Sequence, residues 1–352
     1  MRSTGKDLFG FIAEKIAGFI AANELDASEM LKIGFTFSFP CRQLSLNEGI
    51  LICWTKGFDC PDVVGKDVVQ MLQNAIDERG LNAKIVALVN DTVGTLMATA
   101  YSQPDTAVGM IVGTGTNACY LEKVKNIKNV KLSTRDEFMV VNTEWGAFGD
   151  EDEEFNLNQF TTSYDIAIDQ ASINPSKQKF EKMVSGMYIG ELVRLVLVDL
   201  YESKLLFPTF DSVPYSSGNL LLYTKNSFYT QYVSDIESDR GKTFKTTKSI
   251  LARVGFTKAT KDDCAIVHFV CRLVTQRAAK LLAGALSAML NKMERPTPTI
   301  GIDGSLYRYH PKFKHTVESY CNILLASNTK YTISLASDGS GIGAALAAAA
   351  ST

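Results

Sequence analysis

The stretch "AKIVALVNDTVGTLMA" (Ala83–Ala98) determines how the rest of the chain is interpreted. Residues 85–89 are apolar and rich in β-branched side chains, which is typical of a short buried strand. An amide, a carboxylate and a hydroxyl (Asn90, Asp91 and Thr92) follow directly, and apolar residues then resume. An unpaired carboxylate beside a core costs several kcal/mol of desolvation. Either Asp91 caps the helix that follows, or it lies at the mouth of a site and acts there.

Composition limits the classes of protein to consider. The chain has 352 residues, 46% of them hydrophobic and 21% charged, which is typical of a folded protein with two domains or lobes. The formal net charge of −2 gives no broad electrostatic reason to bind nucleic acid or an anionic membrane. No apolar run reaches the roughly 18 residues that a membrane span needs. The first helix-like segment is amphipathic, unlike a signal peptide. The seven cysteines include no C-x-x-C pair, which indicates neither a disulfide framework nor a zinc site and favours the cytosol.

Strand-like and helix-like segments alternate along the chain, which predicts an α/β fold. The pattern from Lys179 to about Leu206 predicts one long helix, and residues 208–248 give no clear pattern. Several predicted strands end in polar residues, namely Ser38, Asn90, Asp91, Asn117, Glu144 and Asp303. Because ligands bind beyond the carboxyl ends of strands in open α/β sheets, these residues indicate a shared cleft.

Three glycine-rich stretches are candidates for holding phosphate. They are "GTGTN" (residues 113–117), "GIDGSLYR" (301–308) and "SDGSGIGAA" (337–345). Glycine lets backbone N–H groups approach an anion, and small hydroxyls add donors. None is a Walker loop or a Rossmann fingerprint. Each stretch alone is equally well explained as a tight turn, but three of them beside polar strand ends favour a nucleotide site.

At this point several blocks resemble one family, the eukaryotic hexokinases. The blocks are "KIGFTFSFPCRQLSLNEGILICWTKGF" (residues 32–58), "LVNDTVGTLM", "GMIVGTGTNACY", "NTEWGAFGD", "FEKMVSGMYIGELVR" and "IGIDGSLYRYHP". They occur in family order over nearly the whole chain. The resemblance implies a two-lobed actin-like ATPase (ribonuclease-H-like) fold. Residues 1–89 would form part of the small lobe with the sugar signature. Residues 90–352 would form the large lobe with the catalytic base, the second phosphate loop and the adenosine loops.

The resemblance also implies an activity, which is transfer of the γ-phosphoryl group of Mg-ATP to the 6-hydroxyl of glucose or a related hexose, the first step of glycolysis. It assigns Asp91 as the general base, which agrees with the need to orient the attacking hydroxyl, and Lys56 as a second catalytic residue. The implied hexose contacts are Ser38, Phe39, Thr55, Lys56, Asn90, Asp91, Asn117, Glu144 and Glu181. Without the family, Lys56 is equally a solvated lysine, Glu144 an exposed loop acid and Glu181 a first-turn acid.

For ATP with Mg²⁺, the family's nucleotide contacts fall on Gly113, Thr114, Gly115, Thr224, Gly304, Ser305, Gly339, Ser340 and Gly341. The resemblance assigns no protein ligand to the metal. Met187 occupies a position where some family members have a lysine near the phosphates, so that positive charge is absent here.

One family motif is missing from the sequence. The family begins its core with a turn of the form D-L-G-G-T-N-x-R, which grips the β- and γ-phosphates, and no such turn is present. We therefore expect an incomplete small lobe, and a phosphoryl-transfer rate reduced by about 10²-fold or more. The alternative function is a catalytically weak, hexose-binding or regulatory protein. Hexose preference, product inhibition, oligomeric state and association with the mitochondrial surface are left open by the sequence.

Overall fold

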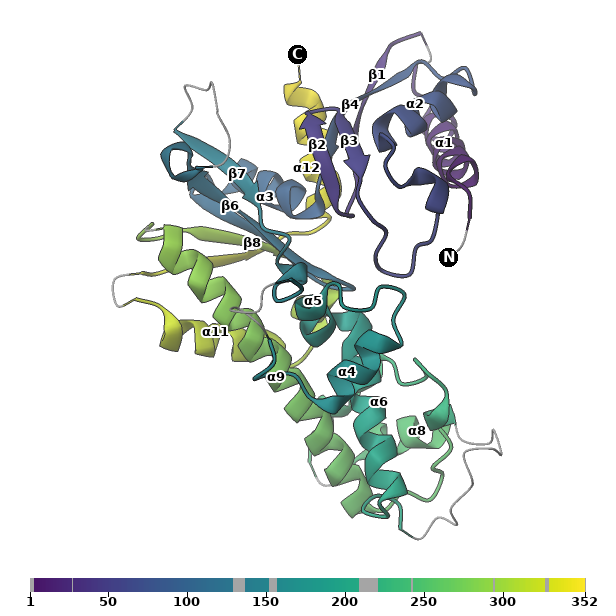
Figure 1. The fold of residues 1–352 in the computed structure, drawn as a ribbon, viewed down its shortest axis with the longest axis vertical. Helices are drawn as coiled ribbons and strands as arrows, with labels where there is room; N and C mark the ends of the chain where they lie inside the picture. The colour runs from purple at the N-terminus through teal and green to yellow at the C-terminus, as the bar shows by residue number, and fades with distance from the viewer. Residues whose placement is uncertain are drawn as a thin grey trace.

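A computed structural model of the chain describes residues 3–26, 28–128, 137–151, 157–208, 221–241, 243–293, 295–326 and 329–351. These residues form two lobes in which strands and helices alternate, so the predicted α/β class is confirmed. In Figure 1 the small lobe lies at the top, the main sheet of the large lobe lies beneath it, and helices extend downward from that sheet.

The small lobe combines two short sheets with helices. Its elements are α1 (Gly5–Ala22), β1 (Leu31–Thr36), β2 (Cys41–Ser45), β3 (Glu48–Leu51), η1 (Pro61–Val63), α2 (Val68–Asp77) and β4 (Ala83–Val89). Strands β1 and β4 pair in parallel, and β2 and β3 form an antiparallel hairpin. Phe9 of α1 and Leu72 of α2 are buried together in the core of this lobe.

The large lobe is built on a sheet with strand order β7-β6-β5-β8-β9. Its strands and the helices that precede the long helix are α3 (Asp91–Ser102), β5 (Thr106–Val112), β6 (Thr116–Lys123), η2 (Val124–Asn126), β7 (Phe138–Asn142), η3 (Trp145–Ala147), α4 (Ser163–Gln170), α5 (Lys179–Val184), α6 (Gly186–Glu202), η5 (Leu221–Tyr223), α7 (Thr230–Glu237) and α8 (Lys245–Arg253). The remaining elements are α9 (Lys261–Met293), β8 (Thr299–Asp303), α10 (Ser305–Tyr309), α11 (Phe313–Leu324), β9 (Thr332–Leu335) and α12 (Gly339–Ala350).

Strand direction in this sheet explains where the site forms. Strands β5 and β6 are antiparallel and joined by the Gly-rich turn at residues 113–115, whereas β5, β8 and β9 run parallel. The loops that leave the carboxyl ends of β5 and β8 therefore meet at one edge of the sheet. The long helix α9 crosses the lobe beside this sheet (Figure 1), and it buries Leu282, Leu286 and Leu290 at helical spacing.

The prediction of one helix from Lys179 to Leu206 is wrong, because the chain breaks at Ser185. This residue has extended backbone angles (φ −84°, ψ 158°) and separates α5 from α6. The amide of Gly186 instead donates to the carbonyl of Gly113 at 2.8 Å. Docking of the β5–β6 turn against the start of α6 thus outweighs the helical periodicity of the sequence.

Helix α12 lies between the two lobes. It packs against β1 and β4 of the small lobe and against α3 of the large lobe. Close approach is possible because glycines face it: a Cβ on Gly34 would collide with the carbonyl of Ala344, and a Cβ on Gly343 would collide with Gly94. The hydroxyl of Thr36 also donates to the carbonyl of Ser340 at 3.1 Å. Although α12 lies in the predicted large-lobe range, it therefore joins both lobes.

Among the helices in the described ranges, none has the length and apolar character needed to cross a bilayer.

Candidate active site

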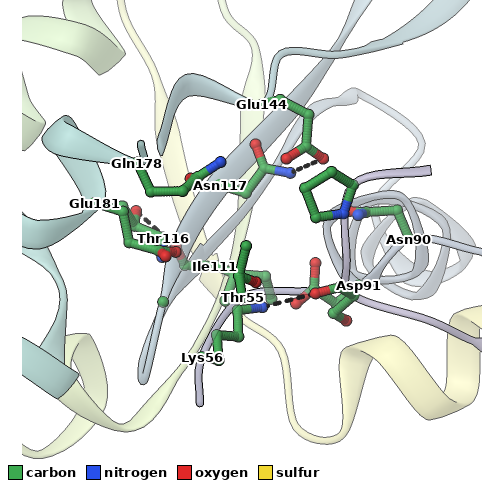
Figure 2. Close-up of a pocket in the computed structure, with 13 residues that line it drawn as sticks. Thr55, Lys56, Asn90, Asp91, Ile111, Thr116, Asn117, Glu144, Gln178 and Glu181 are labelled. Carbon is green, nitrogen blue, oxygen red and sulfur yellow. Dashed lines mark hydrogen bonds between the residues drawn. The ribbon is translucent and has the colours of Figure 1, made fainter. Parts of the chain in front are cut away.

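A pocket between the lobes brings together most of the residues that the sequence predicts to bind hexose. Its walls are Ser38, Pro40, Thr55, Lys56, Asn90, Asp91, Ile111, Gly115, Thr116, Asn117, Glu144, Gln178 and Glu181. Figure 2 shows the labelled side chains around one hollow, with Glu144 and Asn117 on one side and Lys56, Thr55 and Asp91 on the other. The small lobe supplies the lining residues in the range 38–56, and the large lobe supplies those in the range 90–181.

The start of α3 answers whether Asp91 is only a helix cap. The N-cap is Asn90, whose Oδ1 accepts the amide of Thr92 at 3.0 Å and its hydroxyl at 2.7 Å. Asp91 Oδ1 also accepts the Thr92 amide, at 2.9 Å. Its second oxygen, Oδ2, accepts no hydrogen bond from the residues that the structure describes, and it is available to a ligand in the pocket.

Lys56 is held in place by backbone geometry and by one hydrogen bond. Its φ of 56° lies in the left-handed region, which a non-glycine residue adopts rarely, and its Nζ donates to the carbonyl of Ser38 at 2.9 Å. Strain of this kind clusters at functional sites. Phe39, also predicted to contact hexose, does not line the pocket. It packs against Trp54 and Phe58 with ring centroids 4.8 and 5.1 Å away, and so supports the segment that carries Lys56.

Glu144 and Asn117 form one hydrogen-bonded wall. The amide of Asn117 donates to Glu144 Oε1 at 3.0 Å, and Asn142 donates to the same oxygen at 2.7 Å. Glu144 has a left-handed φ of 47° where β7 leads into η3. Burial raises the pKa of Glu144, and the nearby carboxylate of Asp91 adds to the effect, while the Lys56 ammonium and the two amides oppose it.

Glu181 forms the opposite wall from the first turn of α5. Its Oε2 accepts the amide of Thr116 at 3.0 Å. A Cβ on Gly115 would collide with this carboxylate, so a larger residue there would displace the Glu181 side chain. Burial raises the pKa of Glu181, and the Lys56 ammonium opposes this rise. Carboxylates with raised pKa values in a cleft are typical of functional sites.

Four further lining residues were missed by the sequence reasoning: Pro40, Ile111, Thr116 and Gln178. Gln178 is the clearest omission, because it is buried, has a left-handed φ of 57°, and lies three residues before Glu181. Its backbone N–H donates to Asp150 Oδ2 at 2.7 Å, which fixes the chain where it enters α5. Its place just before the "FEKMVSG" block was the available signal.

A second, larger cavity adjoins the Gly-rich turn. It has about 1040 Å³ of space between atoms and is lined by Gly113, Thr114, Gly186, Met187, Thr230, Gln231, Ser234, Asp235, Ser238, Ser305, Leu306 and Tyr309. Of the residues predicted to contact ATP, Gly113, Thr114 and Ser305 line it. Met187 also lines this cavity, and its methyl group lies near Gly57. Gly57 directly follows Lys56, so the cavity reaches toward the pocket between the lobes.

Asp303 ties two of the predicted nucleotide loops together. Its Oδ1 accepts the amide of Gly304 at 2.7 Å, and its Oδ2 accepts the amide of Gly339 at 3.1 Å. Gly304 has a φ of 127°, and a Cβ there would collide with the carbonyl of Val112. The loops 113–115, 304–305 and 339–341 therefore converge, although Gly339, Ser340 and Gly341 lie at the start of α12 and outside the cavity lining.

Thr224 does not line this cavity, and Thr230 does. Thr224 follows η5, a segment fixed by the buried Glu191–Arg194 pair: Arg194 donates to the carbonyl of Leu222, and Glu191 accepts the amide of Asn226. The segment around Thr224 has no regular sequence pattern, so the sequence did not indicate which threonine faces the loops. The fold turns Thr230 toward them.

Comparisons with known proteins agree with this arrangement. Two hexokinase family models match residues 1–101 and 107–350. The hexokinase of Schistosoma mansoni is 41% identical and covers 100% of this chain, which spans 76% of that relative. Human hexokinase-3 is 42% identical over 99% of this chain, which spans 37% of that protein's length. The chain belongs to the hexokinase family.

Solved structures define the fold. The structure of the Schistosoma mansoni hexokinase complexed with glucose aligns with a TM-score of 0.91 at 41% identity, covering 99% of this chain and 76% of that one. A ROK-family glucokinase from Streptomyces griseus aligns with a TM-score of 0.52 at 13% identity, covering 95% of this chain and 86% of that one, which supports the fold alone. The two-lobed actin-like fold predicted from the sequence is confirmed.

Proposed function

We propose that this chain is a hexokinase that transfers the γ-phosphoryl group of ATP to the 6-hydroxyl of D-glucose and related hexoses. The observation that carries the proposal is the position of Asp91, whose free oxygen faces a pocket of hydrogen-bonding side chains from both lobes. A hexose needs such fixed donors and acceptors around its hydroxyls. Family membership at 41% identity, with a glucose-bound relative of the same fold, supports the same reading and favours it over the alternative of a regulatory sugar-binding protein.

The chemistry follows from the placement of charges. Asp91 accepts the proton of the 6-hydroxyl while that oxygen forms a bond to the γ-phosphorus, and ADP leaves with the electrons of the broken P–O bond. The ammonium of Lys56, oriented by the carbonyl of Ser38, supplies positive charge beside the reacting groups. Glu144, Glu181 and Asn117 hold the ring hydroxyls, so that the 6-hydroxyl points at Asp91.

ATP would enter the larger cavity with its phosphates toward loops 113–115 and 304–305, whose backbone N–H groups and small hydroxyls suit an anion. Mg²⁺ would arrive on the phosphates of ATP, since it is usually held by them with one or two carboxylates. In the described ranges no group of three or more His, Cys, Asp or Glu side chains is arranged to hold a metal. A cytosolic location, indicated by the cysteine pattern, remains a prediction.

The test is ADP release from Mg-ATP by the purified chain with glucose, with 6-deoxyglucose and without sugar. We expect ADP only with glucose, together with an equal amount of glucose 6-phosphate. The 6-deoxy sugar is a matched control because it can occupy the pocket but has no hydroxyl to phosphorylate. Glucose-dependent thermal stabilisation without ADP would instead support the regulatory alternative, and no response to glucose would contradict both.

A further inference from the structure

A buried pair of side chains joins two walls of the nucleotide cavity from behind. Glu237 is the last residue of α7, the helix that contributes Thr230 and Ser234 to the cavity. His310 follows α10, the helix that contributes Ser305 and Tyr309. The Nε2 atom of His310 lies 3.4 Å from Glu237 Oε1, and the two side chains are 0% and 1% exposed. Neither side chain lines the cavity, so neither is placed to touch the nucleotide.

The hydrogen bonds of His310 determine where its proton lies. Its Nδ1 accepts the backbone amides of Lys312 and Phe313, at 3.3 and 3.1 Å, at the start of α11. An imidazole nitrogen that accepts hydrogen bonds carries no proton, so the ring proton is on Nε2 and faces Glu237. Among the residues that the structure describes, Nε2 makes no hydrogen bond of good geometry, and the Glu237 carboxylate lies 3.4 Å from it. The contact therefore brings a buried imidazole N–H, at the end of α10, beside a buried carboxylate at the end of α7.

A third helix contacts the same oxygen of Glu237. The hydroxyl of Thr275 on α9 donates to Glu237 Oε1 at 2.5 Å. Burial by itself would raise the pKa of Glu237, but donation from His310 and Thr275 outweighs burial and holds the pKa below its usual range. Removing either donor would leave the buried Glu237 carboxylate without one of its partners, which is energetically costly.

We propose that the Glu237–His310–Thr275 contact sets the spacing of α7 and α10 and thereby positions the two walls of the nucleotide cavity. His310 and Glu237 are then positioning residues for ATP, acting through Ser305 on one wall and Thr230 on the other. A misplacement of about 1 Å can be costly for a bound substrate. The effect should fall on the nucleotide, because neither α7 nor α10 lines the proposed hexose pocket. This inference rests on the proposed use of the cavity by ATP.

The experiment compares His310→Gln, Glu237→Gln and the milder Thr275→Val with the unaltered chain. Three quantities are measured: the KM for ATP, the KM for glucose, and the Kd of a non-hydrolysable ATP analogue by calorimetry. We expect the ATP KM and the analogue Kd to rise about tenfold in His310→Gln and Glu237→Gln, as for loss of one buried hydrogen bond to a charged group. In Thr275→Val we expect a rise of about threefold, as for a weaker single bond. The glucose KM should stay within about twofold, because the hexose pocket keeps its walls.

The matched control is Asp165→Asn, which breaks the partly buried Asp165–Arg277 ion pair between α4 and α9, away from the cavity. It should lower the melting temperature without changing either nucleotide constant. The proposal is overturned if His310→Gln leaves the analogue Kd unchanged, or if the ATP and glucose constants rise together in all variants. Analogue binding by a chain that shows no turnover would contradict the proposed function while still deciding this inference.

Discussion

The proposed hexose pocket and the proposed nucleotide cavity offer different kinds of groups to a ligand. The hexose pocket is small, with about 370 Å³ of space between its walls, and its polar groups are side-chain atoms contributed by both lobes. The nucleotide cavity is larger, at about 1040 Å³, and its walls are large-lobe helices and glycine-rich turns. A ring of hydroxyls requires fixed side-chain partners, whereas phosphates bind to backbone N–H groups. Substitutions in the first site should therefore act through single functional groups, and those in the second through backbone spacing.

The largest expected effect is on Asp91. Asp91→Asn keeps the shape of the side chain but removes the base, so kcat for glucose phosphorylation should fall by about 10³-fold, within the range for general base catalysis. The glucose Kd should change only a few-fold, since the amide can still hydrogen-bond the sugar. Stopped assays of ADP release and calorimetry with glucose measure the two quantities. A kcat within tenfold of the unaltered chain would show that Asp91 is not the base.

Glu181→Gln separates binding from stability. Loss of a charged acceptor should raise the glucose KM by about 10- to 100-fold and leave the ATP KM unchanged. The folded-state pKa of Glu181 is raised by burial, so between its usual value and that raised value the folded state holds more protons than the unfolded state. Stability therefore falls as pH rises through this window. Removing the charge should raise the melting temperature at pH 7, measured by calorimetry. A lower melting temperature would contradict the burial argument.

The pH dependence of the glucose KM of the unaltered chain tests the same pocket independently. Because burial raises the pKa values of Glu144 and Glu181 above the usual 4.5, both carboxylates gain protons as pH falls toward that value. Each then loses acceptor capacity, and we expect the glucose KM to rise as pH falls toward 4.5. The ATP KM should vary less, apart from titration of ATP itself. Equal pH profiles for the two substrates would mean that the carboxylates are not the sugar's partners.

Gly304→Ala probes the nucleotide side. With a φ of 127° and a backbone carbonyl in the way, alanine must shift the loop, at a cost of about 1–3 kcal/mol. We expect the ATP KM to rise about tenfold, as for a loss of that size, with an unchanged glucose KM. Gly284→Ala in α9 is the matched control, since nothing lies within 4 Å of its added Cβ, and it should be neutral or stabilising. Equal effects of the two substitutions would refute the argument from loop geometry.

The smallest expected change is a gain. Met187 lines the nucleotide cavity and is 42% exposed, so Met187→Lys would add a cation near the predicted phosphate position at little packing cost. The ATP KM should fall about threefold, as for a partly exposed ion pair, and the gain should shrink at high salt. Met187→Gln, of similar length but neutral, is the control. An unchanged ATP KM in the lysine variant would place the phosphates elsewhere.

Much of the hexose pocket could be predicted, because its side chains lie in motifs that are contiguous in sequence. Ser38, Lys56, Asn90, Asp91, Asn117, Glu144 and Glu181 all line one pocket. Phe39 shows the limit of this reasoning, since the motif contains it but packing turns it into an aromatic cluster with Trp54 and Phe58. The nucleotide side was less predictable, because Thr230 and Ser234 lie on a helix whose orientation no local pattern reveals.

By itself, the sequence determined the alternation of strands and helices, the glycine-rich turns and the family, since these depend on local periodicity and on contiguous motifs. Tertiary structure alone decided the break at Ser185, the position of α12 against both lobes, and the contact of Glu237 with His310. Each of these depends on residues far apart in the chain competing for the same space or the same hydrogen bond. That competition is settled only when the whole core is packed.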